Sequence, residues 1–593
     1  MSSFAISASA SAAVNLVSRA PPRRVATHRA SSTRVRAIQE PTGETATAEE
    51  EAQPASRAAD EDIPAPVGTA SKEEFMAWML GVQKLPEGKM DLVVDLPEGR
   101  GLVAREDVRK GESLLEIPDA TLITVARAVS ESKLGPAHVK LQEWSLLAAF
   151  LAEQALAIEQ GDESGKFAVY IRALPRRTGG VLDWPEEDIN TLLAGSPSLR
   201  AAKDRQTSVE SAILTIRGEF PQLTPGALRW AFDVLFSRLI RLPSRGGELA
   251  LVPWADMLNH KPGCEAYIDD SGGMVCLSPD RKYRPGEQVF ASYGARPSSE
   301  LLISYGFAPP VGENPDDFYD LVLGVDPDDR WAEQKAAALR GLGLRPVETF
   351  PLRLNGYPKQ LLQYASFILC DPEDPSELPE VRIVRFPNHD TLFADCPSNY
   401  VIHMARHHKC TVRPESRRLF IHTSHGKTDP FRFQKQLAQR ALIGNKAIGG
   451  LLGMVTKKRG TQGEVLGGEA GEIAVREMVA DITTDALSRY PNTLEKDRDI
   501  ASQDPSKPSK GKKSKFAEEV MPPSAATGND GAFPNADAWV GVFSEPVRQT
   551  QRSVAAARVR VSERRILAKT DSEVRLQLRK IKADMMTKSS KSQ

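Results

Sequence analysis

The feature that most constrains the fold is a β-rich pattern that occurs twice, on either side of a long helical block. Residues 90–118 alternate short β-prone runs with Pro-Glu-Gly and Lys-Gly-Glu turns, which is typical of small antiparallel strands. Residues 251–307 return to this pattern. Residues 124–245 between them carry apolar residues at helical spacing. The β structure must therefore reassemble from distant pieces of sequence around a helical insert.

Polar motifs lie beside the β-prone runs. The sequence Asp-Met-Leu-Asn-His occupies 256–260, and two Tyr-Gly turns follow at Tyr293 and Tyr305. In the first stretch, glycines flank the arginine of Glu-Gly-Arg-Gly at 98–101, so the backbone there can approach another group closely. Each motif alone has a common structural explanation, because short polar residues favour caps and turns and tyrosines are often half-buried in cores. Together they predict a polar site on a β scaffold.

Composition narrows the class of protein. Of 593 residues, 41% are hydrophobic and 26% are charged, which is typical of globular proteins, and the length suggests three or four units of about 150 residues. The 77 Lys and Arg nearly balance the 78 Asp and Glu, so the net charge of −1 does not favour direct binding to nucleic acid. A nucleic acid partner is expected only through a larger complex. No apolar run is long enough to cross a bilayer, so we expect no membrane partner. Five cysteines, an odd number, argue against a disulfide scaffold.

The N-terminal region is expected to lie outside the folded domains. Residues 1–39 contain no Asp or Glu and many Arg, Ser and Ala, which is the composition of a plastid transit peptide, with a basic disordered tail as the alternative. Residues 40–70 are rich in Glu, Ala, Pro and Thr and predict a disordered linker. Folding is expected to begin near Ser71, which forms a capping box with Glu74.

A group of histidines and cysteines at 396–425 could be taken for a metal site. His403 and His407 are four apart, which is the spacing of two ligands on one helix face. No Cys-x-x-Cys accompanies them, and the surrounding Arg and Lys would repel a cation. The pattern therefore predicts a basic surface insertion and no metal, with zinc as the alternative.

The motifs, taken in order, resemble those of the SET-domain lysine methyltransferases. They are Glu98-Gly99-Arg100-Gly101-Leu102, then the 256–260 sequence, Tyr293-Gly294 and Tyr305-Gly306-Phe307. The long helical insert is similar to that of the plastid Rubisco large-subunit methyltransferase family, and residues 486–497 and 554–567 resemble that family's C-terminal substrate-binding domain. No phosphate-binding loop, dinucleotide fingerprint or nucleophile elbow is present.

The resemblance implies an α+β fold with SET-domain β-sheets and an α-helical insert, followed by a mostly α-helical substrate-binding domain. The SET domain would occupy 71–310, with its insert at about 124–245. The substrate-binding domain would occupy 320–582, with irregular inserts at 375–430 and 498–535. Residues 583–593 would form a basic tail.

The resemblance also implies a cofactor, S-adenosylmethionine, and residues that hold it. Glu98, Gly99 and Arg100 would bind its amino-acid end and ribose. Asn259 and His260 would bind its adenine and amino-acid parts, largely through backbone groups.

Other residues would serve the substrate. Tyr293 would be the catalytic residue, with its hydroxyl beside the transferring methyl group. Tyr305 would shape the lysine channel and stack near the cofactor, Arg238 would lie near both cofactor and substrate, and Asp256 would face the substrate side. The chemistry needs no metal, because a narrow apolar channel favours the neutral lysine and the rest of the work is alignment of nitrogen, methyl and sulfur.

The implied function is a protein-lysine N-methyltransferase of the plastid stroma that acts on a stromal protein, with Rubisco large subunit or a plastid aldolase as candidates by family. Two departures from the family pattern motivate an alternative: Lys261 replaces a Ser after Asn-His, and the Ser-Asn expected before Glu300 is replaced within 296–299. The alternative is a catalytically weak or inactive SET-fold subunit of a plastid gene-expression complex. Histidine is an alternative acceptor, since SET relatives can methylate it.

Overall fold

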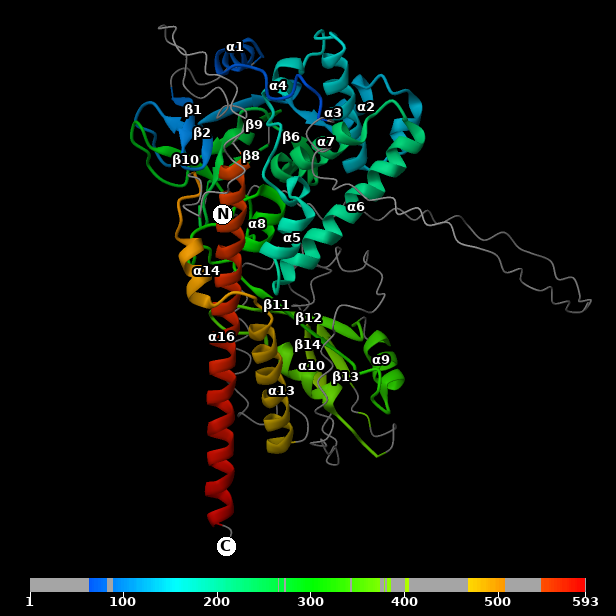
Figure 1. Ribbon diagram of the computed structural model, residues 1–593, viewed down its shortest axis with the longest axis vertical. Helices are drawn as coiled ribbons and strands as arrows, with labels where there is room; N and C mark the ends of the chain where they lie inside the picture. Colours follow the sequence, from blue (N-terminus) through cyan, green and yellow to red (C-terminus); the bar gives the residue numbers. More distant parts are fainter. Residues whose placement is uncertain are drawn as a thin grey trace, which may run out of the picture.

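The computed structural model describes residues 63–82, 89–264, 266–270, 273–341, 344–373, 378, 381–385, 400–404, 468–506 and 545–591 (Figure 1). The predicted transit peptide, most of the predicted linker, the tail beyond Lys591 and most of the His/Cys group lie outside the described residues.

Strands from the two β-rich stretches join across the helical insert, as predicted. One sheet has the order β1-β2-β10-β7, formed by β1 (Met90–Leu96), β2 (Gly99–Ala104), β10 (Gln288–Ala291) and β7 (Asn259–His260). β10 pairs antiparallel with β2 and parallel with β7. This pairing carries the Asn-His motif to the Glu-Gly-Arg-Gly hairpin.

Two small sheets complete this part of the molecule. One has the order β3 (Leu115–Pro118), β9 (Met274–Ser278) and β8 (Tyr267–Asp269). The other has the order β4 (Ile123–Thr124), β6 (Glu248–Leu251) and β5 (Ile240–Leu242). Both also combine strands from opposite sides of the insert, so the β structure depends on the whole of it.

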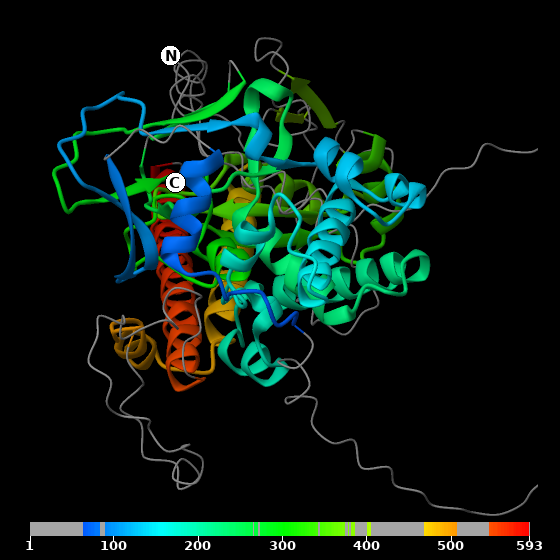
Figure 2. The same ribbon diagram turned by 90° about the horizontal axis from the view of Figure 1, so that it is seen from above.

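The insert is helical, as predicted, and its helices are α2 (Val125–Glu131), α3 (Glu143–Glu159), α4 (Ala168–Ala173), α5 (Glu186–Leu192), α6 (Pro197–Glu219) and α7 (Pro225–Arg238). Hydroxyl N-caps from Thr124, Ser196 and Thr224 begin α2, α6 and α7. α3 is buried on most sides and packs on α7, where the Trp144 and Phe236 rings lie 5.2 Å apart. Figure 2 shows the insert (cyan to green) gathered on one side and the β1–β2 hairpin (blue) on the other.

The N-terminal helix α1 (Lys72–Val82) begins where the capping pattern predicts, with the Glu74 N–H donating to Ser71 Oγ at 3.0 Å. The predicted linker, however, ends too late. Val67 and Ala70 are fully buried in the main core, and the Arg176 guanidinium donates to the carbonyl oxygens of Ile63 and Pro64. Composition missed this because 63–70 is anchored by contacts with the distant insert rather than by its own pattern.

The C-terminal part is less helical than predicted. It contains two antiparallel pairs, β11 (Tyr319–Gly324) with β12 (Val347–Leu352) and β13 (Val381–Arg385) with β14 (Tyr400–Met404). The second pair lies within the region predicted to be irregular. His403 therefore lies on a strand, opposite Arg382, and not on the helix face that the spacing to His407 suggested.

The C-terminal helices are α9 (Ala332–Gly341), α10 (Lys359–Leu369), α13 (Gly468–Ser488), α14 (Leu494–Ala501) and α16 (Glu545–Lys591). α16 runs along the molecule from the N-terminal part to the C-terminal end (Figure 1) and packs on α5, α8 (Ser298–Tyr305), α13 and α14. Two predicted boundaries are wrong: α14 extends through 498–501, and α16 continues through the predicted tail to Lys591. No helix in the described part of the chain is long and apolar enough to span a membrane.

Candidate active site

The two motifs that are farthest apart in sequence meet at a hydrogen bond. The Asn259 side-chain amide donates to the Arg100 carbonyl at 3.0 Å and to Gln288 Oε1 at 2.7 Å, and Gln288 in turn donates to the Glu98 carboxylate at 2.8 Å. Gly101 makes this approach possible, because a Cβ there would lie 2.6 Å from the Asn259 amide nitrogen. The structure thus brings together the residues predicted to bind the cofactor.

His260 holds the backbone at Tyr293. The Tyr293 N–H donates to His260 Nδ1 at 3.0 Å, which requires that nitrogen to be unprotonated. Burial, helped by the charge of Arg296, lowers the pKa of His260 to about 4, so the ring is neutral at physiological pH. His260 therefore positions the Tyr293 backbone through its side chain, a role that the sequence did not predict. Its predicted contact with the cofactor stays a prediction.

The Tyr293 hydroxyl has a fixed direction. It donates to the Leu258 carbonyl at 2.7 Å, directly before the Asn-His strand. Burial raises the pKa of this phenol, so it stays protonated and uses its proton in this bond. The lone pairs of the hydroxyl oxygen then remain available to a donor or a positive centre.

Tyr293 belongs to a group of four aromatic rings. The Tyr293 and Tyr305 rings lie 4.8 Å apart, and the His260 and Tyr293 rings 5.1 Å apart. Phe307 lies 6.2 Å from His260 and 6.3 Å, edge-on, from Tyr305. Aromatic faces attract ammonium and sulfonium groups, and they exclude water. The two predicted tyrosines are therefore joined by His260 and Phe307 in one aromatic group.

Asp256, predicted to face the substrate side, is a buried carboxylate. Its side chain has no exposed surface, it forms an ion pair with Arg238 at 3.1 Å, and it accepts a hydrogen bond from the Tyr170 hydroxyl at 3.0 Å. Arg238 also donates to the Asp256 backbone carbonyl at 2.7 Å. The sequence did not predict this burial, because Tyr170 and Arg238 come from the distant insert. The substrate-side role of Asp256 stays a prediction.

The Arg100 side chain belongs to the same buried region. It donates to the Ala173 carbonyl at 2.7 Å, and burial together with the charge of Arg238 lowers its pKa to about 9. Its guanidinium therefore anchors β2 to the insert, and only its backbone lies beside Asn259.

Arg296 is a site residue to which the sequence assigned no role. It is 4% exposed, its Nε donates to the Tyr293 carbonyl at 2.8 Å, and it pairs with Glu300. Its guanidinium also lies 5.9 Å from the centre of the Tyr305 ring. Arg296 thereby contacts both tyrosines, Tyr293 through its backbone and Tyr305 through its ring. The only sequence signal was that it stands where the family pattern differs.

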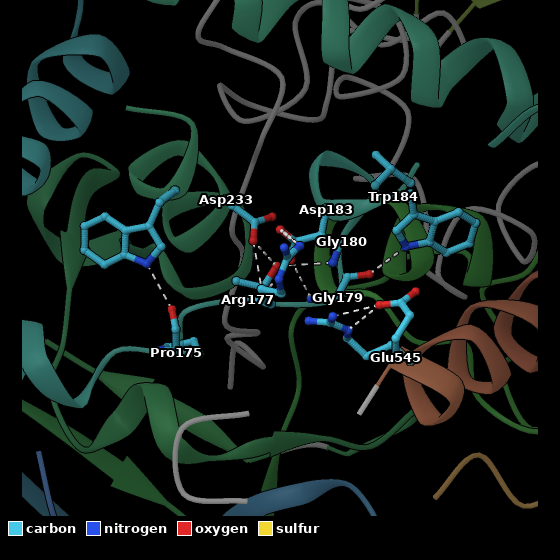
Figure 3. Close-up of polar contacts among 12 residues, drawn as sticks. Pro175, Arg177, Gly179, Gly180, Asp183, Trp184, Asp233 and Glu545 are labelled. Atoms are coloured by element: carbon cyan, nitrogen blue, oxygen red, sulfur yellow. Dashed lines mark hydrogen bonds and ion pairs between the residues drawn. The ribbon is translucent and has the colours of Figure 1, made fainter. Parts of the chain in front are cut away.

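A loop of the insert packs against Gly306, the residue after Tyr305. A Cβ at Gly306 would lie 2.4 Å from the backbone of Gly179. The loop that contains Gly179 is fixed by two carboxylates, the partly buried Asp183 and the buried Asp233 (Figure 3), and the Thr178 hydroxyl donates to Asp233 at 2.6 Å. Burial raises the pKa of both carboxyls, most strongly that of Asp233, which lies beside Asp183.

Comparison with known proteins places this arrangement in a family. Residues 99–294 match the family model described as SET domain, and residues 326–397 and 455–567 match the model described as Rubisco LSMT substrate-binding. The chain contains a SET domain followed by a Rubisco LSMT substrate-binding domain. The resemblance inferred from the motifs is thus confirmed.

Relatives and solved structures agree with this assignment. The chain is 32% identical over 256 residues to the chloroplastic fructose-bisphosphate aldolase-lysine N-methyltransferase of Arabidopsis thaliana, covering 40% of this chain and 51% of that protein. It is 28% identical over 339 residues to the chloroplastic Rubisco large subunit N-methyltransferase of Nicotiana tabacum, covering 53% and 66%. It is also 28% identical over 326 residues to the actin-histidine N-methyltransferase of Danio rerio, covering 51% and 52%.

The chain therefore matches between about half and two thirds of the length of these relatives. The structure of Rubisco LSMT bound to AdoMet superposes with a TM-score of 0.55 at 19% identity, covering 86% of this chain and 92% of that one. This likeness confirms the predicted α+β fold. Among the residues that the structure describes, no group of three or more His, Cys, Asp or Glu could hold a metal ion.

Proposed function

We propose that this protein is a protein-lysine N-methyltransferase that uses S-adenosylmethionine and acts on a plastid protein. The observation that carries the proposal is the meeting of Asn259 with the Arg100 backbone beside the aromatic group of His260, Tyr293, Tyr305 and Phe307. One side offers polar groups for a nucleoside and an amino acid, and the other offers rings for a positively charged methyl donor and an amine.

The residues present fit the cofactor. The turn at Glu98 and Gly99 is open, because a Cβ on Gly99 would meet no atom within 4 Å. Arg238 Nε and Asp256 Oδ1 are buried beside Tyr293 and have no hydrogen-bond partner among the described residues, so a polar ligand there would satisfy them. When bound, S-adenosylmethionine supplies the methyl group on a sulfonium.

The chain's own residues would align the reaction and keep the acceptor amine neutral. The Tyr293 hydroxyl, fixed by the Leu258 carbonyl, presents its oxygen to the reacting centre. The rings of Tyr293 and Tyr305 exclude water from the place where the amine would enter. The loss of water lowers the pKa of an incoming lysine, as burial does in general.

The proposal is tested with the full chain and two readouts. Calorimetry measures binding of S-adenosylmethionine by the wild type and Tyr293→Phe, and labelled cofactor is then incubated with plastid stromal extract. We expect both proteins to bind the cofactor, the wild type to label a protein, and the variant to lose about 10²-fold or more in rate. Absence of cofactor binding by the wild type would refute the enzyme and favour an interaction subunit.

The names of relatives support the finer parts of the proposal. Two relatives are named chloroplastic, and the Arg- and Ser-rich composition of residues 1–39 agrees with a plastid location. The substrates in their names, aldolase and the Rubisco large subunit, are the first proteins to assay. Because another relative is an actin-histidine methyltransferase, mass spectrometry of the labelled protein decides between lysine and histidine.

A further inference from the structure

A cavity of about 490 Å³ lies outside the site just described, between the end of the SET domain and two helices of the substrate-binding domain. Pro310 and Val311 form one wall, α14 contributes Arg498 and its C-cap Ser502, and α16 contributes Val561 and Arg565. The cavity thus combines an apolar surface with two guanidinium groups.

The charge of these two arginines is not neutralised within the described part of the chain. Neither the Arg498 nor the Arg565 side chain has a hydrogen-bond or ion-pair partner among the residues that the structure describes. The neighbouring arginines of α16 differ, since Arg560 pairs with Asp497 at 2.6 Å and Arg558 donates to the Ala308 carbonyl at 2.9 Å. Two unpaired arginines beside apolar surface suit a carboxylate ligand that also carries apolar groups.

The cavity is close to the aromatic group along the chain. Pro310 follows Phe307 by three residues, so their Cα atoms lie at most about 11 Å apart. Arg565 lies against the same turn, because a Cβ on Gly312 would be 2.9 Å from its Nη1. An extended peptide advances about 3.3–3.6 Å per residue. A peptide whose lysine enters the aromatic group can therefore place a side chain three or four residues away in the cavity.

We propose that this cavity binds an aspartate or glutamate side chain of the substrate, about three or four residues from the acceptor lysine. This inference rests on the proposed function and adds a substrate class to it, namely lysines in an acidic and partly apolar context. The carboxylate is held by Arg498 and Arg565, and an adjacent apolar side chain packs on Val311 and Val561.

The experiment measures binding without methyl transfer. The probes are fluorescein-labelled 13-residue peptides with one central lysine and glutamate three or four residues to either side, each with a matched glutamine peptide. Fluorescence anisotropy with the full chain is expected to show at least 10-fold tighter binding of one glutamate peptide over its glutamine match. The double variant Arg498→Gln/Arg565→Gln is expected to abolish that preference.

Arg579→Gln is the matched control, because Arg579 is an exposed arginine on α16 outside the cavity lining. It is expected to keep the preference, and a loss equal to that of the double variant would overturn the proposal. Arg565→Glu adds a test that a folding defect cannot imitate, since it should favour a peptide with lysine in place of the glutamate. Equal binding of glutamate and glutamine peptides by the wild type would also overturn the site.

The two proposals fail separately. Anisotropy requires neither cofactor nor turnover, so an inactive protein still tests the cavity. Conversely, a wild type that methylates glutamate and glutamine peptides with equal kcat/KM refutes the cavity and leaves the methyltransferase intact.

Discussion

Glu563 on α16 provides a test of how the two domains are joined. Its carboxylate accepts hydrogen bonds from Ser196 Oγ at 2.8 Å, at the start of α6, and from the Tyr490 hydroxyl at 2.9 Å, in the substrate-binding domain. The residue is 5% exposed, and burial raises its pKa from 4.5 to about 7. A carboxyl whose pKa is raised in the folded state favours folding when protonated. That contribution is present in full below pH 4.5 and is lost as pH rises to about 7.

The magnitude follows from the two pKa values. A shift of 2.5 units, from 4.5 to about 7, corresponds to about 3 kcal/mol at 1.36 kcal/mol per unit. About 2–3 kcal/mol of this lies between pH 5 and pH 8. Glu563→Gln stays neutral at every pH, so the variant should gain about that much free energy of unfolding over the wild type between these two pH values.

Urea unfolding at pH 5, 6, 7 and 8 measures the effect as a difference between the two proteins, in which the titration of other groups cancels. Glu495→Gln removes an exposed carboxylate on α14 and is expected to follow the wild type. If the wild type and Glu563→Gln give parallel curves of stability against pH, the inferred burial of this carboxyl at the junction is wrong.

Three further predictions concern the site and its support. Tyr293→Phe removes the hydroxyl that donates to the Leu258 carbonyl. Calorimetry should show cofactor affinity within about 3-fold of the wild type, and single-turnover transfer should show a kcat lower by about 10²-fold or more. An unchanged kcat excludes the catalytic role. Asp233→Asn keeps the shape but removes a carboxyl whose pKa is raised well above 3.8, so its stability relative to the wild type should increase as pH rises through and above 4 in thermal melts; a constant difference contradicts the raised pKa of Asp233. Gly306→Ala should lower the free energy of unfolding in urea by about 2–4 kcal/mol, because Gly306 has a φ of +80° and contacts Gly179. Gly286→Ala, with a φ of +85° and no atom within 4 Å, should lower it by about 1–2 kcal/mol. Equal losses would show that the contact with Gly179 is not a cause.

The sequence predicted the parts of this molecule that depend on local pattern and on the order of motifs. Helical spacing located the insert, and the repeated β pattern required strands to pair across it, as β2 and β10 do. The order of motifs predicted that Arg100 and Asn259 belong to one site, and a hydrogen bond joins them in the structure.

The parts that sequence missed depend on long-range burial. The burial of Asp256 depends on Tyr170 and Arg238, which the distant insert supplies. Arg296 has no periodic signal, since its role comes from reaching back to the Tyr293 carbonyl. Residues 63–70 lack a pattern of their own because they pack on a distant helix.

The hydrogen bond between Asn259 and Arg100 joins residues 159 positions apart. Closing a loop of that length costs about 4.5 kcal/mol in chain entropy, so these two walls cannot meet early in folding. During synthesis at about 5–20 residues per second, β2 waits about 8–30 s for Asn259 to be made. Its edge meanwhile lacks the partner strand β10, and an unpaired edge invites pairing with other chains. The geometry that assembles the site thus also makes the nascent chain dependent on protection while its insert is being completed.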